Sequence, residues 1–352
     1  MKQSKRLFAL LLTLAMTLGM LTACGGGNSD TSSEGDGGES SGSNELTVYT
    51  AFPEAEVAYY FNAFEEATGI KVNALRLSAG EMLTRVAAEK DNPQASLMFG
   101  GSTDNYIAAS SQGLLEAYQS PELSNTPENY LDPDGVWNPI YVGAIAFACN
   151  KDWFADKGYD YPTSWDDLLD PKYQDMIIMA HPATSGTAYT VLATLIQLKG
   201  EDAVWDYLKE LDKNMSQYTK SGSGPSKMVG PGECVIAIGF LHDGIYQILQ
   251  GYDNIQLIVP EDGTSFEVGA TAILKGASHP NAAKLWIEYA LSPDCVDHAK
   301  ENGSYQFLVL KNATQPKEAE EFGLDMNNTI DYDFEDAKAN SVKYVEDFFE
   351  AL

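Results

Sequence analysis

The segment that decides the fold is LTVYTAFPEAEVAYYFNAFEEATGIKVNALRLSAGEMLTRVAAEKDNPQASLMFGGS, residues 46–102. It contains a strand, a helix, a strand, a helix and a strand, which we expect at residues 46–50, 54–68, 71–77, 80–90 and 96–99. This alternation predicts parallel strands joined by crossover helices, and hence an open α/β sheet. Such sheets bind ligands just beyond the C-terminal ends of their strands. The residues that follow the strands are therefore the first candidates for a functional site.

The rest of the chain continues the same alternation, and 352 residues fit two domains or two lobes of one architecture. A second α/β set starts near residues 140–150. Further helices are expected at 185–199, 201–213, 243–250, 281–291 and 334–349, with a strand at 268–274. In the last helix we expect Ala337, Val342, Val345 and Phe348 to pack against the core.

The N-terminus has the features of an export signal. Basic residues at positions 2, 5 and 6 precede an apolar run at 7–21, which is too short for a membrane span of about 20 apolar residues. Leu21-Thr22-Ala23-Cys24 follows and resembles a bacterial lipobox. That resemblance implies a signal peptide at 1–23 and a lipid on Cys24, which becomes the new N-terminus. The alternative is an ordinary signal peptide followed by a chance cysteine.

Residues 24–44 are rich in Gly, Ser and acids and, after Cys24, contain no large apolar side chain. Such a segment cannot offset its chain entropy by burial, so we expect a flexible tether.

Composition excludes some classes of partner. The chain has 22 Lys and Arg against 51 Asp and Glu, a formal net charge of −29. A nucleic-acid binder needs a cationic face to replace phosphate counterions, so we expect no nucleic-acid partner. Docking on anionic lipid through a basic patch is disfavoured for the same reason.

Three cysteines remain in the body of the chain, Cys149, Cys234 and Cys295. No C-x-x-C motif and no Cys/His metal spacing occurs, so each is expected to be a small buried residue. One disulfide outside the cell stays open, and the sequence does not pair the cysteines.

Four short polar loops stand at strand ends or before helices. They are Ser78-Ala79-Gly80, Gly100-Gly101-Ser102, Ser185-Gly186-Thr187-Ala188 and Ser221-Gly222-Ser223-Gly224. A helix start offers unpaired N–H groups and a partial positive charge, glycine allows close approach, and hydroxyls add donors. Four such loops together favour an anion site built with little formal charge. Each one alone is also what a helix cap or a tight turn requires.

Few other residues carry chemical information. Arg76 lies before the first polar loop, and Lys220 and Lys227 flank the last. His242 and Asp243 are expected to project from the end of an apolar strand, where they would bond hydroxyl or amine groups. The alternatives are a structural histidine and a helix cap. The sequence contains no H-E-x-x-H, G-x-S-x-G, Walker A or dinucleotide motif, which disfavours an enzyme.

Taken in this order, several stretches resemble one branch of the extracellular solute-binding proteins of ABC importers. That branch includes ferric-ion-binding, aminoethylphosphonate-binding and hexose-phosphate-binding proteins. The stretches are RLSAGE (76–81), FGGS (99–102), SWDDL (164–168), PATSGTAYT (182–190), YTKSGS (218–223) and GFLHD (239–243). The resemblance covers about residues 45–350. It implies an α/β, two-lobed, type II periplasmic-binding-protein fold, with a mostly parallel sheet in each lobe, a ligand cleft between the lobes, and delivery of the solute to a permease.

The resemblance also suggests which solute is bound. Iron-binding members carry adjacent tyrosines after the strand that here ends in Gly239-Phe240, whereas this chain has Leu241-His242. The pattern is closer to the branch for phosphorylated organic solutes. By that resemblance Ser78, Gly80, Thr187, Ala188 and Ser221 hold a phosphate, while His242, Asp243 and Glu267 bond the remainder. The full set of expected ligand-binding residues is Ser78, Ala79, Gly80, Gly101, Ser102, Ser185, Gly186, Thr187, Ala188, Ser221, Gly222, His242, Asp243 and Glu267.

The sequence therefore predicts an import receptor for a hexose phosphate or a phosphonate. The first alternative is a receptor for Fe³⁺ or another anion on the same scaffold, and the second is a lipid-anchored enzyme. We expect no catalytic residue, no metal site and no cofactor, a monomer, a partnership with the permease transmembrane subunits, and anchoring through Cys24 on the outer face of a cell without an outer membrane. The expected lobes are residues 45–142 with 270–302, and 143–269 with 303–352.

Overall fold

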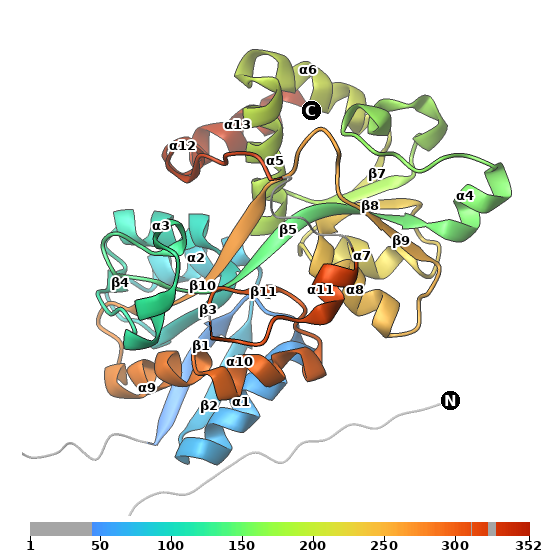
Figure 1. The fold of residues 1–352 in the computed structure, drawn as a ribbon. Helices are drawn as coiled ribbons and strands as arrows, with labels where there is room; N and C mark the ends of the chain where they lie inside the picture. The colour runs from blue at the N-terminus through green and yellow to red at the C-terminus, as the bar shows by residue number, and fades with distance from the viewer. Residues whose placement is uncertain (1–43, 311, 323–328) are drawn as a thin grey trace, which may run out of the picture. The chain divides into compact units, whose positions relative to one another are not determined.

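The computed structural model describes residues 44–310, 312–322 and 329–352 (Figure 1). The predicted signal peptide, Cys24 and nearly all of the predicted tether lie outside these residues. Within them, no helix is both long enough and apolar enough to cross a membrane. The described residues belong to one compact unit.

The first part of the sheet is built by the segment quoted above. Strand β1 (Glu45–Thr50) lies between β2 (Lys71–Arg76) and β3 (Leu97–Ser102) and runs parallel to both. Helices α1 (Glu54–Thr68), α2 (Ala79–Ala88) and α3 (Thr103–Ser111) connect and follow these strands. The strand–helix–strand order predicted for residues 46–102 is therefore confirmed, with α1 at the predicted bounds.

Two strands link this part to the rest of the sheet. β10 (Phe266–Leu274) runs antiparallel to β3 and also to the first half of β5 (Asn138–Asn150). The second half of β5 pairs antiparallel with β8 (Ile236–Phe240) and β9 (Ile255–Ile258). Figure 1 shows β5 and β10 running between the two groups of elements, and we call them the crossing strands.

The second part of the sheet returns to parallel pairing. β6 (Ile177–Ala180) is parallel to β8 on one side and to β7 (Met215–Thr219) on the other. The main path of the sheet runs β2-β1-β3-β10-β5-β8-β6-β7. Two short strands flank it, β4 (Leu115–Glu116) beside β10 and β11 (Phe307–Leu308) beside β5.

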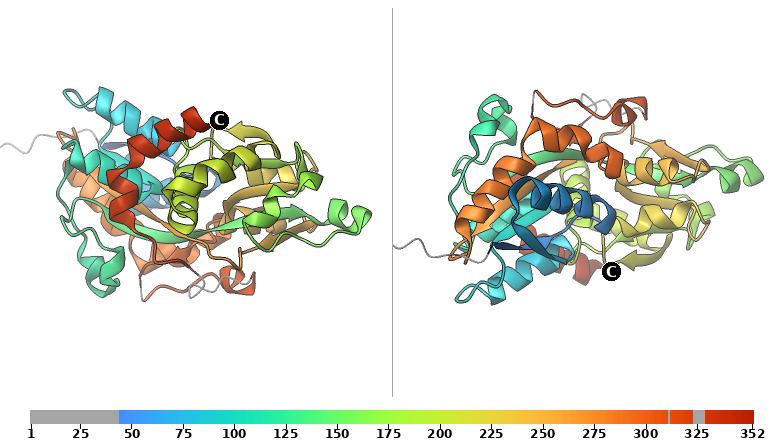
Figure 2. Two further views of the ribbon diagram at one scale, coloured as in Figure 1. Left: turned by 90° about the horizontal axis from the view of Figure 1, so that it is seen from above. Right: turned by 90° about the horizontal axis from the view of Figure 1, so that it is seen from below.

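Helices cover both parts. The remaining α-helices are α4 (Lys151–Lys157), α5 (Gly186–Lys199), α6 (Glu201–Asp212), α7 (Gly224–Val229), α8 (Leu241–Leu249), α9 (Pro280–Ala290), α10 (Pro293–Ala299), α11 (Lys317–Glu321), α12 (Phe334–Ala339) and α13 (Ser341–Ala351). Trp286 anchors one core against Phe61, Phe64 and Phe99, and Trp165 is fully buried in a separate core. Figure 2 shows α13 alongside α5 and α6, which it contacts.

The predicted helix at 334–349 is wrong as a single element. It divides into α12 and α13 at Asn340, whose backbone angles of φ −105° and ψ 6° are not helical. The break changes the phase of the apolar face, so Val342 is 70% exposed although Ala337 and Phe348 are buried as predicted. Cys149, Cys234 and Cys295 are buried and free. The predicted lobe boundaries stay a prediction, because the crossing strands belong to both parts.

Candidate functional site

A cavity of about 60 Å³ lies where the two parts of the sheet meet the crossing strands, and we call it the central cavity. It is lined by Ala51, Phe52, Pro53, Arg76, Ser78, Ala79, Gly101, Ser102, Tyr141, Ser185, Gly186, Thr187, Ser221, Gly222, Ser223, Phe240, His242, Asp243, Glu267 and Gln306. Every residue of the predicted set is among them except Gly80 and Ala188. The four polar loops, which are far apart in the sequence, thus converge on one point as expected.

Gly80 and Ala188 lie just behind this lining. A Cβ on Gly80 would stand 3.1 Å from the Ala183 carbonyl oxygen, so glycine lets the start of α2 approach the loop before α5 closely. Ala188 is buried, and its N–H donates to the Ser185 hydroxyl over 3.3 Å. Both support the walls of the cavity without lining it.

Three helix starts point into the cavity. Ser78 caps α2 by accepting the Glu81 N–H over 3.4 Å, and Ser102 caps α3 by accepting the Asp104 N–H over 3.4 Å. Ser185 caps the 14-residue α5. These three loops are therefore helix caps, which was the alternative interpretation of each loop alone. They also direct the partial positive charges of three helix starts into the central cavity. An anion is the group that such an arrangement favours.

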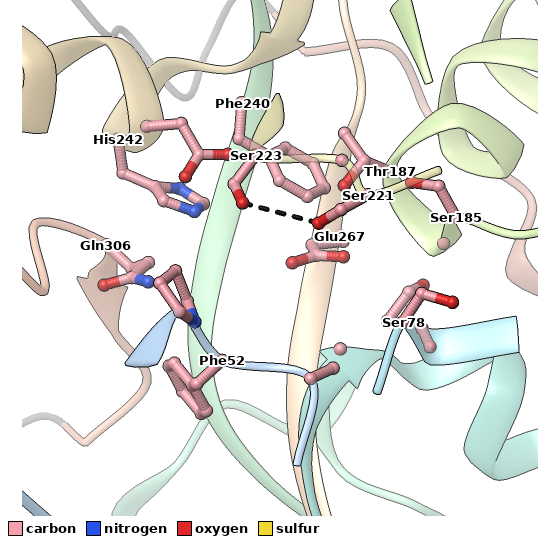
Figure 3. Close-up of a pocket in the computed structure, with 18 of the residues that line it drawn as sticks. Phe52, Ser78, Ser185, Thr187, Ser221, Ser223, Phe240, His242, Glu267 and Gln306 are labelled. Carbon is pink, nitrogen blue, oxygen red and sulfur yellow. Dashed lines mark hydrogen bonds between the residues drawn. The ribbon is translucent and has the colours of Figure 1, made fainter. Parts of the chain in front are cut away.

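The serine and threonine hydroxyls on the two sides of the central cavity differ in whether their protons are already donated to a neighbouring carboxylate. Ser78 donates its proton to the Glu81 carboxylate over 2.9 Å, and Ser102 donates to the Asp104 carboxylate over 2.9 Å. Ser185 only accepts, and the Thr187 hydroxyl has no hydrogen-bond partner among the described residues. Donors for an anion therefore come mainly from the side of α5 and of the Ser221 loop. Figure 3 shows Ser185, Thr187 and Ser221 together, with Ser78 facing them.

We call Ser185, Gly186, Thr187, Ser221 and Gly222 the anion end of the cavity. Its two loops are pressed together, because a Cβ on Gly222 would collide with the Thr187 side chain and stand 3.0 Å from the Ser185 hydroxyl. Only glycine fits at that position without displacing Thr187.

One arginine reaches the anion end from the first part of the sheet. Arg76, at the end of β2, donates from Nη2 to the Ser221 hydroxyl over 2.8 Å and from Nε to the Phe52 carbonyl over 3.4 Å. Beside it, Lys220 forms an ion pair with Glu81. These two contacts join the first and second parts across the cavity, so the structure holds the two sides close together.

The opposite end is lined by the buried titratable groups His242, Asp243 and Glu267. Together with the buried Glu56 behind them, we call these residues the acid wall. Glu267 lies in β10 and accepts a hydrogen bond of 2.9 Å from Tyr141 of β5. Burial raises the pKa of Glu267 to about 8 and that of Asp243 to about 7. Burial also lowers the pKa of His242 to about 3, which keeps its ring neutral.

Glu56 lies directly behind the cavity in the first turn of α1. It accepts hydrogen bonds from the Ser304 hydroxyl over 2.8 Å and from the Gln306 amide over 3.3 Å. Burial raises the pKa of Glu56 to about 8, and the nearby Asp243 carboxylate adds to that rise. Carboxyl groups that are partly protonated near neutral pH both donate and accept hydrogen bonds, and a neutral imidazole does the same. It therefore suits hydroxyl or amine groups.

His242 and Asp243 do not project from a strand end as predicted. α8 begins at Leu241, directly after β8, so both side chains belong to its first turn. The Phe240 ring stacks on the His242 imidazole with 5.1 Å between ring centroids and helps to bury it. The His242 Nδ1 atom is buried without a hydrogen-bond partner among the described residues.

Sequence reasoning missed part of the lining. The missed residues are Ala51, Phe52, Pro53, Tyr141, Phe240 and Gln306. Ala51, Phe52 and Pro53 directly follow β1, so the rule that sites lie beyond strand ends would have found them. Tyr141 and Gln306 carry no local signal. Only pairing of distant segments brings them to the cavity.

No group of three or more His, Cys, Asp or Glu side chains in the described part of the chain is arranged to hold a metal ion. Tyr59 and Tyr60, the adjacent tyrosines, lie in α1 away from the cavity. The Tyr59 hydroxyl donates to the Cys295 carbonyl, and the Tyr60 ring is buried against Phe52 and Phe99.

Comparison with known proteins gives a consistent result. Residues 102–333 match the family described as bacterial extracellular solute-binding protein. An uncharacterized protein of Haemophilus influenzae is 37% identical over 303 residues, which is 85% of this chain and 87% of that protein. A putative 2-aminoethylphosphonate-binding periplasmic protein of Salmonella typhimurium is 27% identical over 270 residues, 73% of this chain and 76% of the relative.

Among solved structures, the periplasmic binding protein AfuA of Actinobacillus pleuropneumoniae, with exogenous fructose-6-phosphate bound, superposes with a TM-score of 0.83. It is 35% identical, and the match covers 87% of this chain and 98% of that one.

Proposed function

Because this chain belongs to the family of bacterial extracellular solute-binding proteins and acts as the solute-binding protein of an ABC importer, we propose that its solute is a phosphorylated small organic anion, a hexose phosphate or a phosphonate. Its fold is the type II fold of periplasmic binding proteins. One of the similar proteins is described with fructose-6-phosphate bound and another as a putative 2-aminoethylphosphonate-binding protein. Each of these two compounds joins an anionic phosphorus group to hydroxyls or an amine.

The observation that carries the proposal is the division of the central cavity into two chemically different ends. The anion end presents the start of α5, hydroxyl donors and Arg76. The acid wall presents carboxyls and a neutral imidazole. A phosphate at the first end and hydroxyls or an amine at the second would satisfy both.

A neighbouring cavity supplies the room that such a solute needs. It has a volume of about 440 Å³ and shares Pro53, Arg76, Ser221, Ser223 and Asp243 with the central cavity. The hydrogen bond from Arg76 to Ser221 lies between the two spaces. When the two parts of the protein separate and this bond opens, the spaces join, and closure then surrounds the solute.

The residues that line the central cavity do not favour Fe³⁺ as the solute. Fe³⁺ prefers anionic oxygen ligands, yet the one tyrosine that lines the central cavity, Tyr141, is bonded to Glu267 in the described structure. Burial raises the pKa of Tyr141 well above its ordinary value, with the Glu267 charge adding to the rise. A neutral phenol is a poor ligand for this ion.

The remaining features of the proposal concern the setting of the receptor. Cys24 carries a lipid after removal of residues 1–23, and residues 24–44 tether the folded body to the outer face of the membrane. The body works as a monomer with lobes at 45–142 with 270–302 and 143–269 with 303–352. It passes its solute to the permease unchanged, as a receptor and not an enzyme, because its relatives are solute-binding proteins.

Thermal unfolding with four compounds tests the proposed solute class. Fructose 6-phosphate, 2-aminoethylphosphonate, fructose and inorganic phosphate are added separately to the purified protein. A ligand at about a hundredfold excess over its Kd stabilises the folded state by about 2.7 kcal/mol. We expect at least one of the two organic phosphorus compounds to raise Tm more than fructose or phosphate does. The absence of a shift with any phosphorylated compound at millimolar concentration would overturn the proposal.

A further inference from the structure

The neighbouring cavity beside the central cavity contains cationic groups of its own. Its volume is about 440 Å³. Two cations line it, Arg76 at the end of β2 and Lys227 of α7, whereas among the described residues only Arg76 lines the central cavity as a cation. The Lys227 ammonium group is exposed and forms neither an ion pair nor a hydrogen bond with a described residue. It is therefore available to an anion that enters the neighbouring cavity.

Arg76 lies at the boundary of the two cavities and has donors left over. A guanidinium group carries five N–H donors. Its Nε donates to the Phe52 carbonyl, and one N–H of Nη2 donates to the Ser221 hydroxyl. The other three donors have no partner among the described residues. Arg76 can therefore contact an anion in the neighbouring cavity while it keeps its bond to Ser221 at the anion end.

Helix α8 supplies an uncharged donor to the same cavity. Gln247 lines the cavity and is only 7% exposed, yet its side-chain amide forms no hydrogen bond with a described residue. Buried amide groups in folded proteins normally have a partner. α8 packs against α7, so Gln247 and Lys227 line one space (Figure 1). The unpaired amide therefore indicates that a polar group enters the cavity from solution.

The acids around the neighbouring cavity do not oppose an anion there. Glu54 is exposed, so its charge is screened by solvent. Burial raises the pKa of Glu56 to about 8 and that of Asp243 to about 7, so both carboxyls are partly or mostly protonated near neutral pH. A protonated carboxyl donates a hydrogen bond to an anion. With two cations, the cavity is therefore positive on balance, although the whole chain has a net charge of −29.

We propose that the solute carries a second anionic group, a phosphate or a carboxylate, which Arg76 and Lys227 hold in the neighbouring cavity while the first group occupies the anion end. This inference rests on the proposed function for the position of the first group. The two cavities share five lining residues, so one small molecule can reach both. A compound with a single anionic group, such as fructose 6-phosphate, then binds through the anion end and leaves Lys227 unpaired.

Two matched pairs of compounds test the proposal by calorimetric titration of the purified protein. The first pair is fructose 1,6-bisphosphate and fructose 6-phosphate, which differ by one phosphate. The second pair is 3-phosphonopropionate and propylphosphonate, which differ by one carboxylate. Because charge-assisted hydrogen bonds are the strong ones, we expect the compound with two anionic groups to have a Kd about tenfold lower in at least one pair. The pair that shows this preference tells whether the second group is a phosphate or a carboxylate.

Substitutions locate the second anionic group. Lys227→Gln removes the ammonium charge from the neighbouring cavity, so the tenfold preference should fall to about twofold. Gln247→Leu keeps a side chain of similar size and removes the buried amide, so it should lower the preference as well. Lys209→Gln is the control, because Lys209 is exposed on α6 and lines neither cavity. The control variant should keep the tenfold preference.

The outcomes separate this inference from the proposed solute class. If fructose 6-phosphate or propylphosphonate binds, and neither compound with two anionic groups binds more tightly than its partner, the inference is overturned and the proposed class stands. Equal preferences in the Lys227 and Lys209 variants also overturn the inference, because the second group then lies elsewhere. If none of the four compounds binds, the inference and the proposed class are both overturned.

Discussion

The anion end and the acid wall belong to one cavity but consist of different kinds of group. The anion end relies on helix starts, hydroxyls and a single arginine. The acid wall consists of Glu56, Asp243 and Glu267, whose pKa values lie at about 8, 7 and 8 because of burial, together with the neutral His242. One end therefore supplies fixed attraction, and the other supplies hydrogen bonds that depend on pH. The chain has a net charge of −29, which repels an anion, so binding requires the local attraction of the anion end.

The largest loss should follow removal of the arginine that reaches the anion end. Arg76→Ala removes a hydrogen bond to a charged group, which is worth about 1.5–3 kcal/mol. We expect the Kd for fructose 6-phosphate, measured by calorimetry, to rise about 10- to 150-fold.

Arg85→Ala is the control, because Arg85 pairs with Glu89 on the surface of α2. Equal effects of the two substitutions would show that Arg76 acts through net charge alone.

Thr187→Val should weaken binding next. It keeps the shape of a side chain that lines the anion end and removes the hydroxyl donor, so we expect a loss of about 1–3 kcal/mol. Thr84→Val, at an exposed position of α2, is the control. An unaltered affinity of the Thr187 variant would mean that the loop serves only as a cap.

The free energy of unfolding of the protein should depend on pH because of the acid wall. Its acids have a higher pKa in the folded than in the unfolded chain, so the folded state binds more protons between about pH 5 and pH 8. The free energy of unfolding then falls as the pH rises through this range. Each proton contributes a slope of up to about 1.4 kcal/mol per pH unit.

Glu267→Gln should flatten this slope, because the amide stays neutral at every pH. Urea unfolding between pH 5 and pH 8.5 measures the slope, with the exposed Glu66→Gln of α1 as the control. If the Glu267 variant keeps the slope of the unsubstituted protein, then Glu267 is charged in the folded state and burial does not keep it protonated.

The smallest effect should come from Asp243→Asn, which alters the acid wall and leaves the anion end intact. We expect a loss of about 0.5–1.5 kcal/mol for a solute with hydroxyls or an amine, and none for inorganic phosphate. Competition binding with both compounds provides the measurement. Equal losses for the two compounds would contradict the division of the cavity into two ends.

The same two ends differ in how far the sequence predicts them. The anion end is made of local patterns. Ser78, which faces it, has with Glu81 the spacing of a capping box, and Ser185 stands three residues before the N–H that it caps. Strand order then brings the loops together, since parallel strands end on the same edge. Ser78, Ser185, Thr187 and Ser221 were found for these reasons.

The acid wall depends on contacts between distant segments. Tyr141 and Glu267 are 126 residues apart, and Glu56 and Ser304 are 248 apart. No periodicity in either segment reveals such a partner. Asp243 was predicted from its place after an apolar strand, and the resemblance to a family assigned it a role together with Glu267. Glu56 and Gln306 were missed.

The break at Asn340 also escaped prediction. α12 and α13 together have a nearly continuous helical pattern. At the break, the Asn340 side-chain amide donates to the Asp336 carbonyl and to the Asp336 carboxylate. The sequence pattern alone therefore gives the helical stretch but not the point at which it divides into two helices.

The most direct test of a two-ended cavity is a crystal structure with fructose 6-phosphate. We expect the phosphate oxygens to lie within hydrogen-bond distance of Ser185, Thr187 and Ser221, and the sugar hydroxyls to contact Asp243 and Glu267. A phosphate seated against the acid wall, or bound outside the central cavity, would contradict this expectation.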